Sequence, residues 1–491
     1  MLIWFLPLFL AVLMLGLPVI FALLAAPGIM LWATDSARDL NLMYRNTFNG
    51  MDSFPLMALP FFMLAGEIMN RGGITTRIVE FSQAFMGHLR GGLAHVNILS
   101  SILFAGLSGS AVADTSALGS TLIPAMEKNG YTRRFAAAVT AASSVIGPII
   151  PPSGIMIIYA YVMGESVAAL FLAGIVPGVL VGVSLMLVVR LMADRYDLPK
   201  AERIVAAGHD MAAVEWWASF AILRLALGGL LYLLLALIPG AEAIPGLLLY
   251  AIGLGLAHAL LAAWKTQITR DFRLVCKRAV APLLTPVIIL GGILFGVFTP
   301  TEASVIAVAY ALVVAFAILR SMTLRDLYDV LARAALASAA VLLLVGAAVA
   351  FKSVVALSHA PEIMTEFILG LSDNPLILLF LINLLLFLVG MFLDAGPAII
   401  ILGPILGPVF TSLGVDPVHF AIIMSVNLTV GLATPPMGLV LFVASTVSGE
   451  KVETISKAIL PFLAVEVLVI FLITYVPAIS MTVPRWAGFV Q

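Results

Sequence analysis

The sequence predicts an all-α polytopic membrane protein with an inverted repeat, two re-entrant hairpins and two proline-broken helices. Three observations predict it: the apolar composition, a matched pair of proline breaks inside apolar segments, and the distribution of lysine and arginine. Of 491 residues, 62% are hydrophobic and 10% are charged, with a mean hydropathy of +1.16. A soluble chain carries roughly 25% charged residues. At ~20 residues per crossing, ten or more spans fit.

The proline breaks are the most specific local signal. The first is Gly147-Pro148-Ile149-Ile150-Pro151-Pro152-Ser153, and the second is Thr434-Pro435-Pro436-Met437-Gly438. A helix cannot continue through such runs, because proline lacks an N–H and clashes with the preceding turn. The freed carbonyls cannot lie in hydrocarbon, so the broken backbone must line an enclosed or watery cavity. Matched breaks in two halves indicate the binding site of a secondary transporter.

In the first half, residues 4–33 are predicted to form one span, too long and too apolar at their start for a cleavable signal peptide. Residues 34–52 form a polar loop, and residues 74–90 form an amphipathic arm along the membrane. The remaining elements are a span at 55–70, a hairpin at 92–126 with the small and hydroxyl residues 107–120 at its tip, a broken span at 133–163 and a span at 166–190.

A charged linker at 191–215 separates the halves and leads into apolar segments. The segments that follow are expected at 216–238, 244–264, 280–298 and 303–319. The first-half pattern then repeats as a span at 336–358, a short amphipathic piece at 361–371, a hairpin at 376–412, a broken span at 418–447 and a last span at 459–479. Asp114 lies 38 residues before Pro152 and Asp394 lies 42 before Pro436, so the halves are offset by about 280 residues.

The charges predict the orientation. Short loops rich in lysine and arginine are cytoplasmic. Such loops contain Arg190, Arg195, Lys200, Arg203, Lys265, Arg270, Arg273, Lys277, Arg278, Arg320 and Arg325. Counting spans from these loops, hairpin 92–126 enters from the cytoplasm and hairpin 376–412 enters from outside. The repeat is therefore predicted to be inverted.

Broken helices that meet hairpin tips offer free carbonyls to small cations and helix N-termini to anions. Ser110 and Asp114 stand one turn apart and could face one cation together with carbonyls around Gly147, Ile150 and Pro152. By pseudo-symmetry, Asp394 would face carbonyls around Gly431, Thr434 and Met437. Substrate contacts are expected from Ser108, Ser116, Ser153, Pro151, Pro435 and Pro436.

Structural alternatives stay open for several of these residues. Asp114 and Asp394 could be helix caps at the hairpin tips, and Ser108, Ser116 and Ser153 could be small packing residues. Glu67 and Glu302 are expected to pair within the scaffold or at a membrane boundary, and Lys352 is assigned no role.

The sequence lacks the residues and motifs that nucleic-acid-binding proteins, disulfide-rich proteins, zinc proteases, ATPases and hydrolases require. The net charge of −1 gives no reason to expect nucleic acid, and the single Cys276 excludes an internal disulfide framework. There is no HExxH and no GxxxxGK[ST], so neither a zinc protease nor an ATP-hydrolysing P-loop is indicated. No histidine within 107–153 could activate the serines there, which disfavours an intramembrane hydrolase.

Several strings together resemble the large membrane subunit of tripartite ATP-independent periplasmic (TRAP) transporters, in order and through nearly the whole chain. They are ALPFFMLAGEIM (58–69), LFAGLSGSAVADTSALGS (103–120), GPIIPPSG (147–154), LLTPVIILGGILFGVFTPTEAS (283–304), MFLDAGPAIIILGPI (391–405) and NLTVGLATPPMGLVLFV (427–443). The insertion at about 200–264, with its two extra helices, departs from the shorter members. It is expected to be a peripheral scaffold addition, or to extend contact with a small subunit or lipid.

The resemblance implies an elevator-type sodium symporter of the bacterial inner membrane, with no enzymatic activity, that imports an organic anion such as a C4-dicarboxylate or a sugar acid. It also implies two protein partners, a small four-helix membrane subunit and a periplasmic substrate-binding protein, and contact with the lipid bilayer. Its sodium sites would fall on Ser110, Asp114, Gly147, Ile150 and Pro152, and on Gly390, Asp394, Gly431, Thr434 and Met437. A standalone ion-coupled anion transporter of similar hairpin architecture is the alternative.

This organisation divides the chain into six parts. They are scaffold and arm helices (1–91), a first transport core (92–190), a linker with the inserted helices (191–279), scaffold helices of the second repeat (280–375), a second transport core (376–447) and a last span with the C-terminus (448–491).

Overall fold

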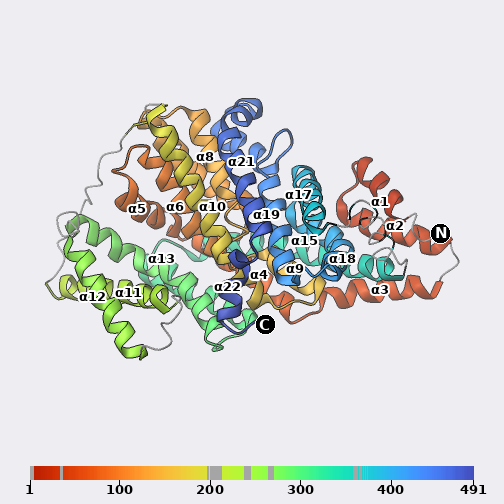
Figure 1. Cartoon of the computed structure of the whole chain (residues 1–491), viewed down its shortest axis with the longest axis horizontal. Coiled ribbons are helices and arrows are strands. Elements are labelled where there is room, and N and C mark those ends of the chain that lie inside the picture. The colour runs from red at the N-terminus through yellow and green to blue at the C-terminus, as the bar shows by residue number, and fades with distance from the viewer. Residues whose placement is uncertain are drawn as a thin grey trace.

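Two helical hairpins, each followed by a broken helix and a long helix, form the centre of the molecule (Figure 1). The computed structural model describes residues 5–33, 37–195, 198–199, 213–236, 245–263, 270–357, 363, 366, 368, 370, 372 and 374–490. Within these residues the regular structure is helical throughout and contains no strand. The predicted amphipathic piece at 361–371 lies mostly outside the described residues.

The first repeat consists of α6 (Gly92–Ser108), α7 (Ala111–Lys128), α8 (Arg133–Ser144), α9 (Gly154–Met163) and α10 (Val167–Arg195). The second consists of α17 (Pro375–Phe392), α18 (Ala395–Ser412), α19 (Pro417–Gly431), α20 (Leu439–Ser448) and α21 (Val452–Tyr475), and α22 (Ala478–Trp486) follows it. The offset between α7 and α18 is 284 residues at both ends, 111 against 395 and 128 against 412. The two repeats therefore share one ground plan.

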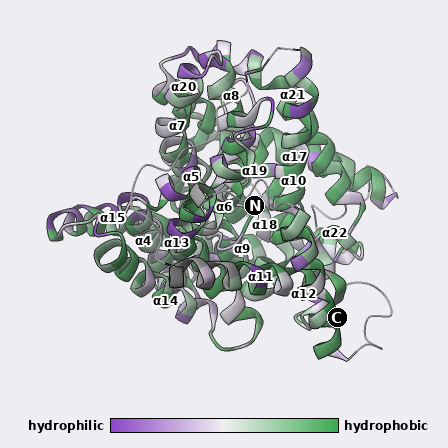
Figure 2. Cartoon of the chain, turned by 90° about the vertical axis from the view of Figure 1, so that its left-hand side faces the viewer, coloured by the Kyte–Doolittle hydropathy of each residue, from purple (hydrophilic) through white to green (hydrophobic). Residues whose placement is uncertain are grey.

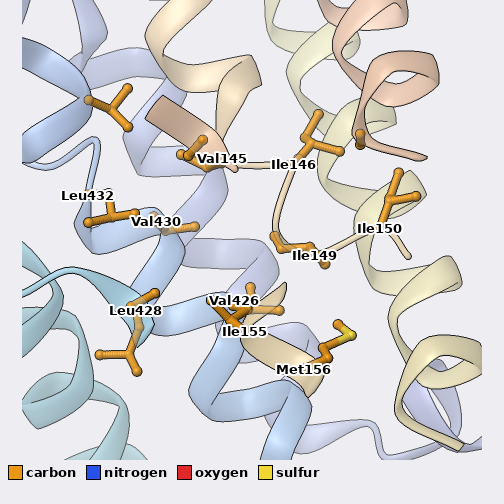
Figure 3. Close-up of a cluster of buried hydrophobic side chains, with 14 of the residues drawn as sticks. Val145, Ile146, Ile149, Ile150, Ile155, Met156, Val426, Leu428, Val430 and Leu432 are labelled. Carbon is orange, nitrogen blue, oxygen red and sulfur yellow. The ribbon is translucent and has the colours of Figure 1, made fainter. Parts of the chain in front are cut away.

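The half-helices that follow the breaks cross over between the repeats. After the first break, α9 packs against α18 and α19 of the second repeat, and after the second break, α20 packs against α7 and α8 of the first. Figure 3 shows apolar side chains beside the first break, Ile146 and Ile149, and beside the second break, Val430 and Leu432, in one buried cluster. The half-helices therefore join the two repeats to each other.

The N-terminal helices correct two expectations from the sequence. They are α1 (Phe5–Met14), α2 (Val19–Ala33), α3 (Ala37–Met51), η2 (Pro55–Met57), α4 (Ala58–Arg71) and α5 (Ile74–Met86). The single span predicted at 4–33 is wrong, because Gly16 has a φ of 84° and Pro18 follows it, which ends α1. The polar loop predicted at 34–52 is also wrong: it contains α3, which buries Met43 and Gly50 against the rest of the protein.

The remaining helices flank the two repeats. They are α11 (Ala213–Ala236), α12 (Gly246–Ala263), α13 (Arg270–Leu294), α14 (Pro300–Leu312), the π-helix η4 (Val313–Ile318) and α15 (Leu324–Leu357). The inserted helices α11 and α12 pack on each other at one edge of the molecule, and α1 and α2 lie at the opposite edge (Figure 1). Within the molecule, α15 packs along α3 and α4 and reaches α9 and α18.

Eight of the described helices are long and apolar enough to cross a membrane: α10, α12, α13, α14 with η4, α15, α17, α18 and α21. The bent pair of α3 and η2–α4, which turns by 53°, makes a ninth. Hydrophilic residues gather near the ends of α8, α20 and α21, while the helices between are mostly hydrophobic (Figure 2). This distribution is that of a multi-pass membrane protein.

Candidate functional site

A cavity of about 630 Å³ lies between both hairpin tips and the flanking helices α4 and α15. Its polar side chains are few, and Lys, Arg and His are absent from its described lining. The lining polar residues are Glu67, Asn70, Ser108, Ser110, Ser116 and Asp394. The cavity is therefore mostly apolar with a small number of hydroxyl, amide and carboxylate groups, in the size range of small-molecule sites.

The first hairpin tip is a two-residue turn between α6 and α7. Gly109 adopts a φ of 61°, a conformation that glycine reaches at no steric cost, and Ser110 caps α7 by accepting a hydrogen bond from the Ala113 N–H at 3.4 Å. Asp114 lies one turn further along α7 and is completely buried. Its Oδ1 accepts a hydrogen bond from the Ser108 hydroxyl. The serines at this tip therefore orient the buried carboxylate.

The other oxygen of Asp114 has no hydrogen-bond partner. Oδ2 is buried beside the first break, and a Cβ added to Gly147 would lie 2.2 Å from it. A buried carboxylate oxygen without a partner costs several kcal/mol unless a proton or a cation satisfies it. Small cations bind carboxylate and carbonyl oxygen atoms, and the Ser144 carbonyl oxygen would lie 3.2 Å from the same added Cβ. The residues at this break therefore fit a small cation.

The second hairpin tip places its carboxylate differently. Asp394 caps α18, and its Oδ1 accepts a hydrogen bond from the Ala395 N–H at 2.8 Å. It is exposed and lines the cavity. Behind it, α17 and α19 touch at Gly390 and Gly431, where a Cβ on Gly431 would lie 2.6 Å from the Gly390 backbone. No side chain fits between these two backbones.

The pairing of Asp114 with Asp394 as counterparts is wrong. With the 284-residue offset that relates α7 to α18, the counterpart of Asp394 is Ser110, and both residues cap their helices. The same offset pairs Pro152 with Pro436 and Gly147 with Gly431. The sequence alone could have shown that Ser110 and Asp394 correspond, because Ser110 lies 42 residues before Pro152 and Asp394 lies 42 residues before Pro436.

The other predicted ligands of the second site lie around the break after α19. Thr434 is buried, and its hydroxyl donates to the Val430 carbonyl at 2.9 Å. Met437 is 56% exposed, Pro436 is exposed and Pro435 is half-buried, and none of the three lines the cavity. In the first break, Ile150 is buried, and the Pro152 carbonyl would lie 2.8 Å from a Cβ on Gly109. The first break therefore touches its hairpin tip directly.

The structure divides the predicted substrate contacts. Ser108 and Ser116 line the cavity, and Ser116 is exposed there. Two predicted cation ligands, Ser110 and Pro152, line it as well. Ser153 is fully buried and caps α9: its hydroxyl donates to the Pro148 carbonyl at 2.5 Å and accepts from the Met156 N–H at 3.4 Å. Pro151 is also buried away from the cavity.

Four residues that sequence reasoning placed elsewhere or missed lie near the site or inside the core. Glu67 pairs with Arg333 at 3.4 Å within the flanking helices, as expected, but it also lines the cavity. Asn70, one turn after the glutamate on α4, lines it too. Lys352 on α15 donates to the Val162 carbonyl at the end of α9. Glu466 is completely buried in α21 and was detectable as the lone charge in an apolar run.

The predicted pairing of Glu302 is local. The Thr299 hydroxyl and N–H both donate to Glu302 Oε2, at 2.9 and 2.8 Å, in a capping box at the start of α14. This carboxylate is exposed and stabilises a helix end.

Comparison with known proteins identifies the family. The model of the DctM component of tripartite ATP-independent periplasmic transporters matches residues 6–479. The chain is 34% identical to the sialic acid TRAP transporter large permease protein SiaM of Vibrio cholerae, over 96% of this chain and 95% of that protein. It is also 34% identical to the C4-dicarboxylate TRAP transporter large permease protein DctM of Pseudomonas aeruginosa, over 94% and 92%.

A solved structure supports the fold. The YdaH transporter of Alcanivorax borkumensis superimposes with a TM-score of 0.54 over 92% of this chain and 90% of that one, at 15% identity. The family's permease subunits are transporters and not enzymes. The chain therefore belongs to the DctM family: it is the large permease subunit of a tripartite ATP-independent periplasmic transporter, a multi-pass inner-membrane protein that works with a small membrane subunit and a periplasmic binding protein.

Proposed function

We propose that this subunit imports an organic anion together with sodium ions, by an elevator movement of the two repeats against the flanking helices. In this proposal the transport core is 92–190 and 376–447, and the scaffold is 1–91 and 280–375. The linker with its inserted helices (191–279) and the C-terminal part (448–491) complete the chain. The position of the cavity between both hairpin tips and the helices α4 and α15 supports this division.

One observation carries the proposal: the cavity has carboxylates but no Lys, Arg or His in its described lining. An anion cannot be neutralised there by a basic side chain. The N-terminal ends of α7, α9 and α18 all reach the cavity and carry partial positive charge. Cations bound beside Asp114 and Asp394 would supply the rest of the charge, which makes anion binding depend on cation binding.

We assign the first sodium site to Ser110, Asp114, Gly147, Ile150 and Pro152, on the support of the buried, unpartnered Oδ2 of Asp114. The second is assigned to Gly390, Asp394, Gly431, Thr434 and Met437. When bound, sodium supplies positive charge and holds each hairpin tip to its break. The side chains then orient the substrate from Ser108, Ser116 and the caps of α7 and α18, with Ser153, Pro151, Pro435 and Pro436 supporting the broken backbone.

The substrate class follows from the cavity and the relatives. The two relatives named above carry a sialic acid and a C4-dicarboxylate in their names. Both compounds are carboxylates that fit a cavity of about 630 Å³. We therefore propose a carboxylate of the dicarboxylate or sugar-acid class, delivered by the periplasmic binding protein.

The test is uptake into liposomes that contain this chain with its small membrane subunit. The purified binding protein is first screened for thermal stabilisation by organic acids, and its best ligand is used radiolabelled. Uptake is expected only with the binding protein present and an inward sodium gradient. Equal uptake with potassium in place of sodium would overturn sodium coupling. Uptake by this chain alone would favour a standalone transporter.

A further inference from the structure

A buried glutamate in α21 has no part in the site described above. Glu466 is 0% exposed, and neither Oε1 nor Oε2 has a hydrogen-bond partner. It lies in the middle of α21, a 24-residue candidate span. Asp114, the other fully buried carboxylate, accepts a hydrogen bond from Ser108, so Glu466 is the less satisfied of the two.

The helices around α21 provide no cation at the level of Glu466. The helices that pack against it are α8, α10, α17, α19 and α20. Within their bounds, α17 and α20 contain no titratable side chain, and α8 has only Arg133 and Arg134, in its first turn. α10 carries its charges, Arg190, Asp194 and Arg195, in its last two turns.

The remaining titratable groups are distant along the helices or already bonded. His419 of α19 bonds the Thr474 carbonyl at 3.2 Å and the Ser480 hydroxyl at 2.7 Å. Thr474 stands eight residues beyond Glu466, about 12 Å along the helix. On α21 itself, Lys457 is nine residues before Glu466 and Tyr475 nine residues after it, each about 14 Å away, and Glu453 is further still. An ionised Glu466 would therefore be a bare charge in a dry interior, which is prohibitively costly.

We propose that Glu466 binds a proton in this conformation, and that α21 moves together with the transport core helices it packs against, so that this proton crosses the membrane with the substrate. The carboxylate takes the proton from a hydronium ion on one side, which leaves as water, and the carboxylic acid returns the proton to water on the other. Because the neutral acid has no unpaired charge, the core can move with Glu466 buried.

This inference rests on the proposed transport function but adds a proton to it. The assay is liposome uptake through the complete three-component transporter at a fixed sodium gradient, with and without a gradient of about one pH unit, acidic outside. One proton per substrate predicts that the pH gradient raises accumulation about tenfold. Glu466→Gln, which imitates the neutral acid, is expected to keep sodium-dependent uptake and lose this tenfold response. Glu453→Gln, on the exposed first turn of the same helix, is the matched control and should retain it.

Infrared difference spectra of the purified chain give a second readout, a protonated carboxyl band in the wild type that Glu466→Gln lacks. An unchanged pH response in Glu466→Gln, or an unchanged carboxyl band, would overturn the proposal. Where Glu466→Gln does not fold, Glu466→Asp keeps a carboxyl, and loss of its pH response would count against proton carriage by this group. Absence of sodium dependence in every variant would instead refute sodium coupling, and the infrared band would still decide the state of Glu466.

Discussion

The two hairpin tips have the same backbone plan but place their charge differently. At the first tip a neutral serine caps α7, and Asp114 is buried one turn inside with one oxygen unpartnered. At the second tip Asp394 is itself the cap, bonded to a backbone N–H and open to the cavity. A capping carboxylate is already satisfied by its helix and by water, whereas the buried one is not. The comparison predicts that, of the two cation sites proposed above, the first depends on its charge and the second tolerates the loss of it.

The largest expected effect comes from neutralising each carboxylate without changing its shape. Asp114→Asn should raise the apparent Kd for sodium roughly 100-fold, about 3 kcal/mol, because a buried charge–cation pair is broken. Asp394→Asn should raise this Kd only about fivefold, since water and the helix cap share that site. Both constants are measured from the thermal stabilisation of the purified chain as the sodium concentration is increased. Equal losses in the two variants would break the comparison.

Alanine at the paired glycines should separate sodium binding from folding. In Gly147→Ala the new Cβ lies 2.2 Å from the Asp114 carboxylate, a side-chain atom that can move away. In Gly431→Ala it lies 2.6 Å from the Gly390 backbone, which cannot. We expect Gly431→Ala to lower stability by about 1–3 kcal/mol with or without sodium. Gly147→Ala should keep most of the sodium-free stability and lose sodium stabilisation, as thermal melts in sodium and in choline would report.

Substitutions of the two capping residues should change the stability of the protein by a smaller amount. Ser110→Ala removes the cap of α7 and should cost about 1 kcal/mol of stability. Asp394→Ser keeps a capping oxygen on α18, so the melting temperature measured without sodium should stay near that of the wild type. A large loss of sodium-free stability in Asp394→Ser would show that the carboxylate has a structural role beyond capping.

The smallest effect concerns the ends of the crossed half-helices. Lys352 of α15 donates to the Val162 carbonyl at the end of α9. Arg133 of α8 instead donates to the Ser448 carbonyl at the end of α20, at 3.4 Å. Lys352→Met should cost about 0.5–1 kcal/mol, the value of a cation at a helix C-terminus. Hydrogen exchange should accelerate at 160–164, and Arg133→Met should instead affect 445–449. If either variant accelerated hydrogen exchange at the ends of both α9 and α20, the two contacts would not act independently, and the prediction would be wrong.

Much of the fold could be predicted because prolines and small residues interrupt an apolar sequence at the positions where the helices end. The hairpins, both breaks and the long spans follow from such local rules. The structure of the N-terminal part could not be predicted in this way. The polar residues of 34–52 suggested a loop, because the sequence does not show that α15 packs against the other face of α3. Within the site, Asp114 and its serines were predictable from their spacing. The positions of Glu67 and Asn70 at the cavity and the burial of Ser153 could not be predicted. They depend on which helices pack against each other, and residue spacing along one segment does not show this.

The crossing of α9 and α20 between the repeats has a consequence for how such a chain could have arisen. Each half-helix packs largely on the other repeat, α9 on α18 and α19 and α20 on α7 and α8, so neither repeat covers its own half-helix. A half-length ancestor with this architecture would have worked only as a dimer whose subunits exchanged these segments and were inserted in opposite directions. Joining two such copies in one chain would preserve this exchange, and the 284-residue offset between α7 and α18 is the spacing that such a joined chain would have.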